Sequence, residues 1–431
     1  MQKRQTAENV QTSLRGIANR AGRDQKHRFG HLYTMLNEEM LESCYWELNR
    51  KSSVGVDGES WREYGKDLKQ RIADLVQRLK AGQYRARMVR RSYIPKGNGK
   101  KRPLGIPVTE DKLLQLAAAK ILEAIHEGMF RNSSWGYRPK RDARTASRVL
   151  GGWLYAGRYN WVVEADIRGY FEHIDHDWLI RMLELRVNDR AFLRLIRKWL
   201  KAGVLEADGK ILHPATGTPQ GGVISPILAN VYLHYVLDLW FERVVWKKVR
   251  GQAVLMRYAD DFITAFEKEE EAEAFLGWLK ERLKKFGLEL AEEKTRKIRF
   301  SKEMKQNGAF EFLGFEYRWH ISRKGKAHVR RRTAPTRLRK AVAAFSMWIK
   351  ENRHLGTGAL LWQLRPKLMG YWNYYGVRGN FASLNKFWCE VRRRLFKWLN
   401  RRSQRHSYNW EGFQQLLNAL QVPGPRITEA L

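Results

Sequence analysis

The chain has 431 residues, and its 81 Lys and Arg outnumber its 45 Asp and Glu by 36 charges. Such an excess would repel itself in a compact protein unless a polyanion lay nearby, so it indicates a nucleic-acid partner ahead of an anionic membrane surface. Hydrophobic residues make up 43% of the chain, which excludes a wholly disordered protein, and the length suggests several domains.

Membrane and secretory proteins are the next classes to be excluded. No window of about 20 apolar residues is present, so we expect no membrane span. The first residues, MQKRQTAENVQTSLRG, lack the apolar core of a signal peptide. Cys44 and Cys389 are too far apart in sequence for a disulfide framework or a zinc ribbon. We therefore expect a reduced, cytosolic protein.

The first 160 residues predict helices around one pair of strands. Residues 1–28 are polar and basic and predict a loose or weakly helical arm. Apolar spacing then predicts helices over 31–48 and 61–82, the second ending at Gly82. The stretch MVRRSYIPKGNGKKRPLGIP predicts a strand, a glycine and lysine loop and a second strand, and helices are predicted over 110–128 and 141–156.

The rest of the chain predicts a mixed region followed by helices. In order, the patterns predict a buried strand over 159–166, two helices within 176–202, a hairpin over 204–212, a long helix over 225–245, two strands around 258–261, a helix over 268–287, and strands near 295–300 and 311–319. From residue 334 amphipathic helices predominate, including 338–349, 357–376 and 381–402. The basic segment SRKGKAHVRRR links the two parts and places a boundary near 325–335.

Three carboxylates lie in segments whose apolar pattern predicts buried strands. Asp260 and Asp261 interrupt LMRYADDFITAF, and Asp166 closes the apolar strand in WVVEADIRGYF. Two adjacent acids alone are compatible with an ordinary turn. Three acids from two strands favour a site for two Mg²⁺ ions about 3.5–4 Å apart, because carboxylate oxygens suit Mg²⁺ and the cations relieve the repulsion. His173 and His176 are interpreted as turn and helix-start residues.

Several loops add candidates for binding a nucleotide. In TGTPQGGVISP, Gln220 can hydrogen-bond, and Gly221 lets the backbone approach a ligand. Lys96 and Arg102 lie on a basic loop that suits a triphosphate, although a solvated loop is the alternative. Lys294 is compatible both with protonating pyrophosphate and with lying on the surface. The strand that turns at Gly314 is compatible with gripping a primer or with hairpin packing.

The order ADIRGYF, GTPQGGVISP, RYADDF, GLELAEEKT and FLGF resembles reverse transcriptases. With VGVDG and IPKGNGKKRPLGIP upstream and YYGVRGN and RRRLFKWLNRRSQRHSYNWEGF downstream, the chain resembles the bacterial group II intron reverse transcriptase/maturase family. The resemblance spans roughly residues 30–425. It implies an α+β right-hand polymerase with a basic arm (1–28), fingers (29–158), a catalytic palm with interleaved fingers segments (159–328) and an all-α thumb, or domain X (329–431).

The resemblance also assigns roles to residues. Asp166, Asp260 and Asp261 correspond to the metal-binding acids, with the Ile167 carbonyl as a further ligand of two Mg²⁺ ions, for which Mn²⁺ can substitute. Phe171 corresponds to the aromatic gate that excludes a 2′-hydroxyl and so selects dNTPs. The resemblance further assigns dNTP contacts to Lys96, Arg102 and Gln220. Beside these assignments, we expect Gly221 to contact the dNTP and Lys294 to be a candidate general acid. We expect a primer grip at Phe312, Leu313 and Gly314, and nucleic-acid contacts of the thumb at Arg337, Arg339, Lys340, Arg392 and Arg393.

We therefore expect an RNA-directed DNA polymerase that extends a DNA or RNA primer on an RNA template. It is also expected to bind group II intron RNA as a maturase in the bacterial cytosol, with monomer and homodimer both open. Two alternatives are a free-standing repair polymerase and a non-catalytic RNA-binding splicing cofactor. Thumb aromatics such as Trp362, Tyr371 and Trp372 are expected mostly to pack, with base stacking as the alternative. Longer family members carry an H-N-H endonuclease that two cysteines cannot build, so we expect the priming nick to come from elsewhere.

Overall fold

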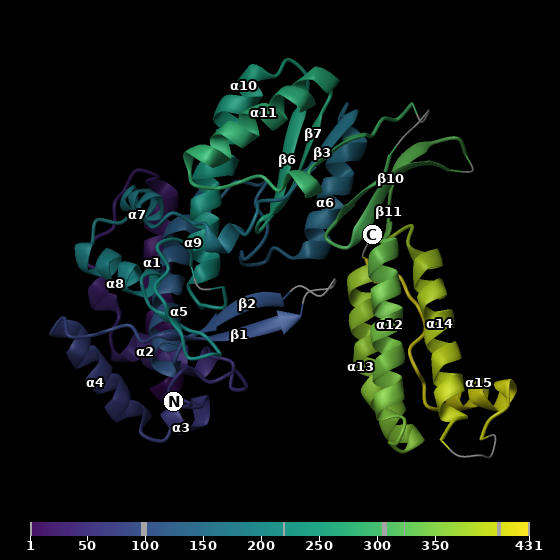
Figure 1. The fold of residues 1–431 in the computed structure, drawn as a ribbon, viewed down its shortest axis with the longest axis horizontal. Coiled ribbons are helices and arrows are strands. Elements are labelled where there is room, and N and C mark those ends of the chain that lie inside the picture. The colour runs from purple at the N-terminus through teal and green to yellow at the C-terminus, as the bar shows by residue number, and fades with distance from the viewer. Residues whose placement is uncertain are drawn as a thin grey trace.

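The structure is a computed structural model that describes residues 2–95, 101–218, 220–303, 308–322, 324–402 and 407–429. It is an α+β protein in which an N-terminal helical lobe, a central antiparallel sheet and a C-terminal helical bundle form the predicted right-hand arrangement (Figure 1). No helix in these ranges is both long and apolar enough to cross a membrane.

The N-terminal lobe consists of helices with one small sheet. Its helices are α1 (Gln2–Arg23), α2 (Glu38–Glu47), α3 (Trp61–Tyr64), α4 (Leu68–Lys80) and α5 (Thr109–His126). Of the predicted loose or weakly helical arm, the helix is present, but α1 is not loose, because Val10, Leu14 and Ala21 are buried where it packs against α2 and α5. Tertiary packing supplies most helical stability, and three apolar residues in a basic stretch are a weak signal in the sequence.

Two predicted helices of this lobe begin or break at identifiable residues. The helix expected over 31–48 begins only at Glu38, because the side chain of Asn37 caps it by accepting a hydrogen bond from Met40 N. The helix expected over 61–82 is split at Gly65 into α3 and α4. A Cβ at Gly65 would lie 1.9 Å from the hydroxyl oxygen of Tyr45, so this glycine lets two segments approach closely.

The fingers sheet combines segments far apart in sequence. Its order is β2-β1-β4-β5, formed by β1 (Val89–Pro95), β2 (Lys101–Ile106), β4 (Val204–Leu205) and β5 (Ile211–Leu212). The hairpin predicted over 204–212 is confirmed, and β4 runs parallel to β1. In Figure 1, β1 and β2 extend from the helical lobe toward the C-terminal bundle.

The central sheet has the order β6-β7-β3-β8, with every neighbouring pair antiparallel. Its strands are β3 (Trp161–Ala165), β6 (Ala253–Tyr258), β7 (Asp261–Phe266) and β8 (Arg296–Arg299). Alternate residues of β3 enter two different apolar clusters: Val163 faces the fingers side, and Val162 faces the cluster that includes Phe315. The sheet is therefore buried on both faces and holds its strand ends rigidly.

Helices precede and connect the strands of this sheet. They are α6 (Ala143–Ala156), α7 (His176–Glu184), α8 (Arg190–Leu200), α9 (Ser225–Leu233), α10 (Trp246–Lys248) and α11 (Glu269–Lys285). The helix predicted over 225–245 is present, but two π-helical segments, His234–Asp238 and Phe241–Val245, interrupt its α-helical geometry between α9 and α10. His176 begins α7, as predicted.

A second sheet leads into the thumb. It has the order β11-β10-β9, formed by β9 (Phe310–Phe312), β10 (Phe315–Ile321) and β11 (Ala327–Thr333). The predicted basic link is wrong for β11, because this arginine-rich segment pairs with β10 along its whole length and buries Arg331 and Thr333. The thumb follows as α12 (Pro335–Asn352), α13 (Thr357–Tyr375), α14 (Phe381–Leu399) and the unpredicted α15 (Trp410–Ala419), around an apolar cluster of their own.

Candidate active site

The three predicted acids lie at one end of the central sheet. Strand β3 pairs with β7 so that Ala165 is opposite Phe262, and the next residue along β3, Asp166, therefore lies beside Asp261. Asp260 occupies the two-residue turn between β6 and β7, since Tyr258 pairs with Asp261. Sheet register thus brings together carboxylates from two segments that are more than 90 residues apart in sequence.

The turn that carries Asp260 has an unusual backbone. Ala259, its first residue, has a φ of 57°, in the left-handed region that two-residue hairpin loops require and that alanine adopts at a cost. Gly136 packs directly on this turn, because a Cβ at Gly136 would lie 2.3 Å from Ala259 N. The loop that contains Gly136 therefore fixes the position of the turn.

The electrostatics of the site disfavour three free negative charges. Burial, followed by the charge of Asp166, raises the pKa of Asp260. Burial, Asp260 and Asp166 together raise the pKa of Asp261 to about 6, although Asp261 keeps contact with solvent. The Asp166 carboxylate accepts a hydrogen bond from Lys294 Nζ, and this bond raises the pKa of Lys294. Lys294 therefore neutralises Asp166 directly, whereas no hydrogen bond from a cationic side chain to Asp260 or Asp261 is present in the part of the chain that the structure describes.

We predict that Asp261→Asn stabilises the metal-free protein above neutral pH. The folded-state pKa of about 6 exceeds the ordinary 3.8, so the charge that forms as the pH rises through this interval lowers the stability of the fold. Calorimetry in a chelator should therefore give a higher Tm for the variant at pH 8 and equal values at pH 4. Asp177→Asn, at a carboxylate that is 74% exposed, is the control. A lower Tm for Asp261→Asn at pH 8 would contradict the prediction.

A cavity of about 240 Å³ lies beside Asp166 and Asp261. The predicted residues that line it are Asp166, Asp261, Lys294, Phe312, Leu313, Gly314 and Arg337. Leu313 and Gly314 form the turn between β9 and β10, with φ values of 52° and 78°. The hydroxyl of Tyr374 donates to Leu313 O (2.8 Å), so thumb helix α13 supports this turn directly.

The predicted nucleotide-binding loop docks on two neighbours. Thr218 N donates to Phe171 O (2.8 Å), which ties the loop to the 3-10 turn Tyr170–Glu172. Gly105 N of β2 donates to Gln220 O (2.7 Å). Gly221 has a positive φ of 112°, and its backbone packs closely against Gly105. The loop is therefore fixed between the palm and the fingers sheet.

The other predicted nucleotide contacts are only partly placed. Phe171 is buried beside Tyr170. Arg102, at the start of β2, is exposed and close enough to Asp260 to lower that acid's pKa in opposition to burial. Lys96 lies outside the described residues.

The predicted thumb contacts do not form one group. Arg337 lines the cavity, and Arg339 and Lys340 are exposed on the first turns of α12. Arg392 instead packs inside the thumb, with its guanidinium 5.7 Å from the Trp388 ring centroid. Arg393 pairs with Glu390 on the same helix.

The thumb aromatics also divide into two kinds. Tyr371 and Trp372 are buried and pack in the thumb core, as expected for most of these residues. Trp362 is 73% exposed and does not belong to that core.

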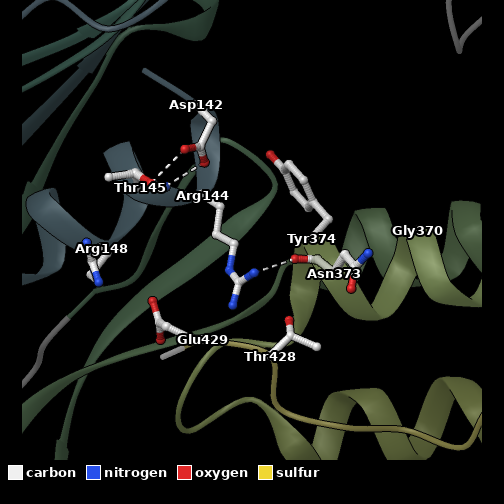
Figure 2. Close-up of a pocket in the computed structure, with 9 residues that line it drawn as sticks. All are labelled: Asp142, Arg144, Thr145, Arg148, Gly370, Asn373, Tyr374, Thr428 and Glu429. Carbon is white, nitrogen blue, oxygen red and sulfur yellow. Dashed lines mark hydrogen bonds between the residues drawn. The ribbon is translucent and has the colours of Figure 1, made fainter. Parts of the chain in front are cut away.

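A larger cavity, of about 590 Å³, lies where the thumb meets α6 (Figure 2). Arg144 on α6 donates to Asn373 O on α13 (2.9 Å), and Tyr374 points into the same space. The C-terminal segment closes one side with Thr428 and Glu429, and Glu429 accepts two hydrogen bonds from Arg331 of β11. The base of the thumb is thus held to α6.

Two residues without a predicted role act at the site through tertiary contacts. Arg257 belongs to the RYADDF motif, and it is fully buried behind the acids. Tyr137, with a left-handed φ of 55°, places its hydroxyl near Asp260 and Arg102, and burial followed by Asp260 raises its pKa. Only the motif around Arg257 carries a signal in the sequence; nothing marks Tyr137.

The donor set suits a divalent cation. Arg168 N donates to Glu289 O and Ala291 N to Asp166 O, so the carbonyl of the intervening Ile167 points away from that segment. Three carboxylates and this carbonyl are hard oxygen ligands. Within the described ranges, no group of three or more His, Cys, Asp and Glu side chains is close enough together to hold a metal by itself.

A sheet whose strand ends present three acids, a glycine loop docked between Phe171 and Gly105, and a helical bundle whose Arg337 lines the cavity beside the acids are the parts of a template-dependent nucleic-acid polymerase. A family described as "Reverse transcriptase (RNA-dependent DNA polymerase)" matches residues 94–317. The group II intron-encoded protein LtrA of Lactococcus lactis subsp. cremoris is 31% identical, covering 86% of this chain and 75% of LtrA. The chain belongs to the group II intron reverse transcriptase/maturase family and is an RNA-directed DNA polymerase.

The chain is also similar to one further curated protein and to one solved structure. Protein YkfC of Escherichia coli K12 is 33% identical, covering 58% of this chain and 74% of YkfC. A telomerase from Candida albicans, solved with a fragment of telomeric RNA, has a TM-score of 0.45 and 12% identity, covering 84% of this chain and 66% of the telomerase chain. Membership of the reverse transcriptase family implies a nucleic-acid template and primer and dependence on a divalent metal.

Proposed function

We propose that the polymerase adds dNTPs to a primer 3′-hydroxyl on an RNA template, in a site where Asp166, Asp260, Asp261 and the Ile167 carbonyl hold two Mg²⁺ ions. The observation that carries this proposal is the register that sets Asp166 beside Asp261, with Asp260 in the adjoining turn. The raised pKa values of the paired acids indicate a site that favours positive charge. Mn²⁺ is expected to substitute, since its oxygen-ligand preferences are similar.

The reaction joins the primer oxygen to the α-phosphorus of the dNTP as the bond to pyrophosphate breaks. Bound Mg²⁺ would supply charge neutralisation and a more acidic 3′-hydroxyl. Lys294 Nζ holds a proton at the edge of the site and would deliver it to the leaving pyrophosphate. Arg102, near Asp260, would neutralise the triphosphate, and the turn at Leu313 and Gly314 would support the primer end.

Primer extension tests the proposal directly. The purified protein should extend a DNA primer on an RNA template with dNTPs and Mg²⁺, and extension should stop in a chelator. No extension with either Mg²⁺ or Mn²⁺ would refute it.

We predict that Phe171→Val relaxes the choice of sugar. Phe171 is proposed to lie under the ribose, and a smaller side chain leaves room for a 2′-hydroxyl. The ratio of rNTP to dNTP incorporation should rise about tenfold or more, since a shaped pocket typically discriminates small groups by about 10–200-fold. Side-by-side kinetics with rNTPs and dNTPs measure it. Phe192→Val, a change in the buried core of α8, is the packing control. An unchanged ratio in an active variant would remove Phe171 from this role.

We also propose that the protein binds group II intron RNA as a maturase in the bacterial cytosol. The support is the similarity to LtrA, whose name describes a group II intron-encoded protein, together with the net charge of +36. A free-standing repair role is less favoured because intron-encoded proteins recur among the relatives. Light scattering would distinguish a monomer from a homodimer.

A further inference from the structure

Arg257 lies fully buried directly behind the catalytic turn. Its Nε donates to Asp238 Oδ1 (2.7 Å) and its Nη2 to Asp238 Oδ2 (2.6 Å), so the two side chains form a bidentate ion pair. The Asp238 side chain is fully buried as well. Burying both charges carries a large desolvation cost, so the pair needs an explanation beyond stability alone.

The other donors of Arg257 reach three separate segments. Nη1 donates to Ala259 O (2.9 Å) and to Asn230 Oδ1 (3.0 Å). Nη2 also donates to Ser134 Oγ (2.6 Å). All five N–H groups of the guanidinium therefore have acceptors, and one of these is the carbonyl of the residue immediately before Asp260.

The same network holds the opposite side of the turn. Asn230 Nδ2 donates to Gly136 O (2.8 Å), and Gly136 packs against the backbone of Ala259. Arg257 N donates to Ser133 O, and Trp135 N donates to Arg257 O, so the loop runs beside β6 like a further strand. Ala259 is thus confined between Gly136 and the Arg257 guanidinium.

The π-helical segment His234–Asp238 supplies Asp238 to this network. Asn230 lies on α9 before that segment, and both side chains reach the same guanidinium. π-Helical turns are rare and recur at functional sites, because the wider turn changes which residues share a face. Here the wider turn brings two acceptors of different charge onto one arginine.

The left-handed φ of Ala259 carries backbone strain, and strained residues persist where their surroundings over-determine them. A network that served stability alone would not need to end on this carbonyl. We propose that Arg257, together with Asp238 and Asn230, is a positioning network that holds the Ala259–Asp260 turn so that Asp260 faces Asp166 and Asp261. The proposal rests on the proposed function of these acids.

Two variants test the network, Asp238→Asn with the larger disruption and Asn230→Ala with the smaller. The first removes the buried countercharge, and the second removes one acceptor of Arg257 and the bond to Gly136. Glu110→Gln is the matched control, because Glu110 makes a bidentate ion pair with Arg78 between α4 and α5. Variants are compared at temperatures below their measured Tm.

We expect kcat for dNTP addition to fall about tenfold or more in both network variants, with KM for dNTP and affinity for the template–primer within about twofold of wild type. Glu110→Gln should keep kcat within about twofold. Binding of Mn²⁺ to the protein without substrates, followed by the electron paramagnetic resonance signal of the free ion, should weaken in the network variants only.

An unchanged kcat and unchanged Mn²⁺ binding in the folded Asn230→Ala protein would overturn the proposal. A loss of kcat no greater than that of Glu110→Gln would do the same, because it would assign the ion pair to stability alone. If wild type binds Mn²⁺ but does not extend a primer, the proposed polymerisation fails, and the Mn²⁺ comparison still decides whether the network positions the acids.

Discussion

Asp260→Ala should lower primer extension at least about a hundredfold while leaving affinity for the template–primer within about twofold. Phosphoryl transfer depends on neutralising charge at the reacting phosphate, and Asp260 occupies the turn beside both other acids. Affinity for a duplex, by contrast, generally comes from contacts between cationic side chains and phosphates, which a carboxylate does not make. Single-nucleotide addition and filter binding measure the two effects separately.

Asp177→Ala is the control for this change, because its carboxylate is exposed and pairs with Arg197 on the surface. It should extend the primer at the wild-type rate. Splicing of a group II intron RNA should survive Asp260→Ala if the proposed maturase role depends on the bound RNA surface. Normal extension by Asp260→Ala would refute the assignment of the acids.

Gly136→Ala should lower extension about tenfold or more without weakening the grip on the template–primer. The added Cβ would lie 2.3 Å from Ala259 N and 2.9 Å from Ala259 Cα, both backbone atoms that cannot rotate away. The turn must therefore shift, and Asp260 shifts with it. Single-turnover kinetics measure the rate of extension, and a template–primer binding assay measures the affinity.

Gly152→Ala provides the matched control for the glycine variant. This glycine lies in α6, and a Cβ added there would meet nothing within 4 Å, so alanine should be accepted and should favour the helix. Wild-type kinetics in Gly136→Ala would mean that the turn tolerates displacement. Loss of activity in both variants would point to a general effect on folding.

The parts of the fold that could be predicted from sequence are those with local signals. Apolar periodicity located α5, α11, α12, α13 and α14, and the apolar runs around Asp166 and Asp260 located the strands that meet in the sheet. The pairing of the acids followed from their equivalent positions at strand ends. The resemblance of the motif order to reverse transcriptases supplied the family, which the comparisons confirm.

The missed features depend on contacts between distant segments. Strand β11 consists largely of basic residues, and only its pairing with β10 makes it a strand. In the sequence, Arg257 is one charged residue in a predicted strand. Only the folded structure places Asp238, Asn230 and Ser134 around its guanidinium. A buried charge that hydrogen-bonds to several distant segments produces no periodic pattern in the sequence, so sequence patterns could not have revealed this network.

The bond from the Tyr374 hydroxyl to Leu313 O has a mechanical consequence. The thumb begins at Pro335, just after Ala334 N donates to Gly314 O, so the bundle is tied to the same short turn twice. Swinging the bundle outward must either break these ties or drag the turn along. If this turn supports the primer end as proposed, a product duplex that pushed the bundle aside would also displace that support, which would link the load on the thumb to the alignment of the next addition.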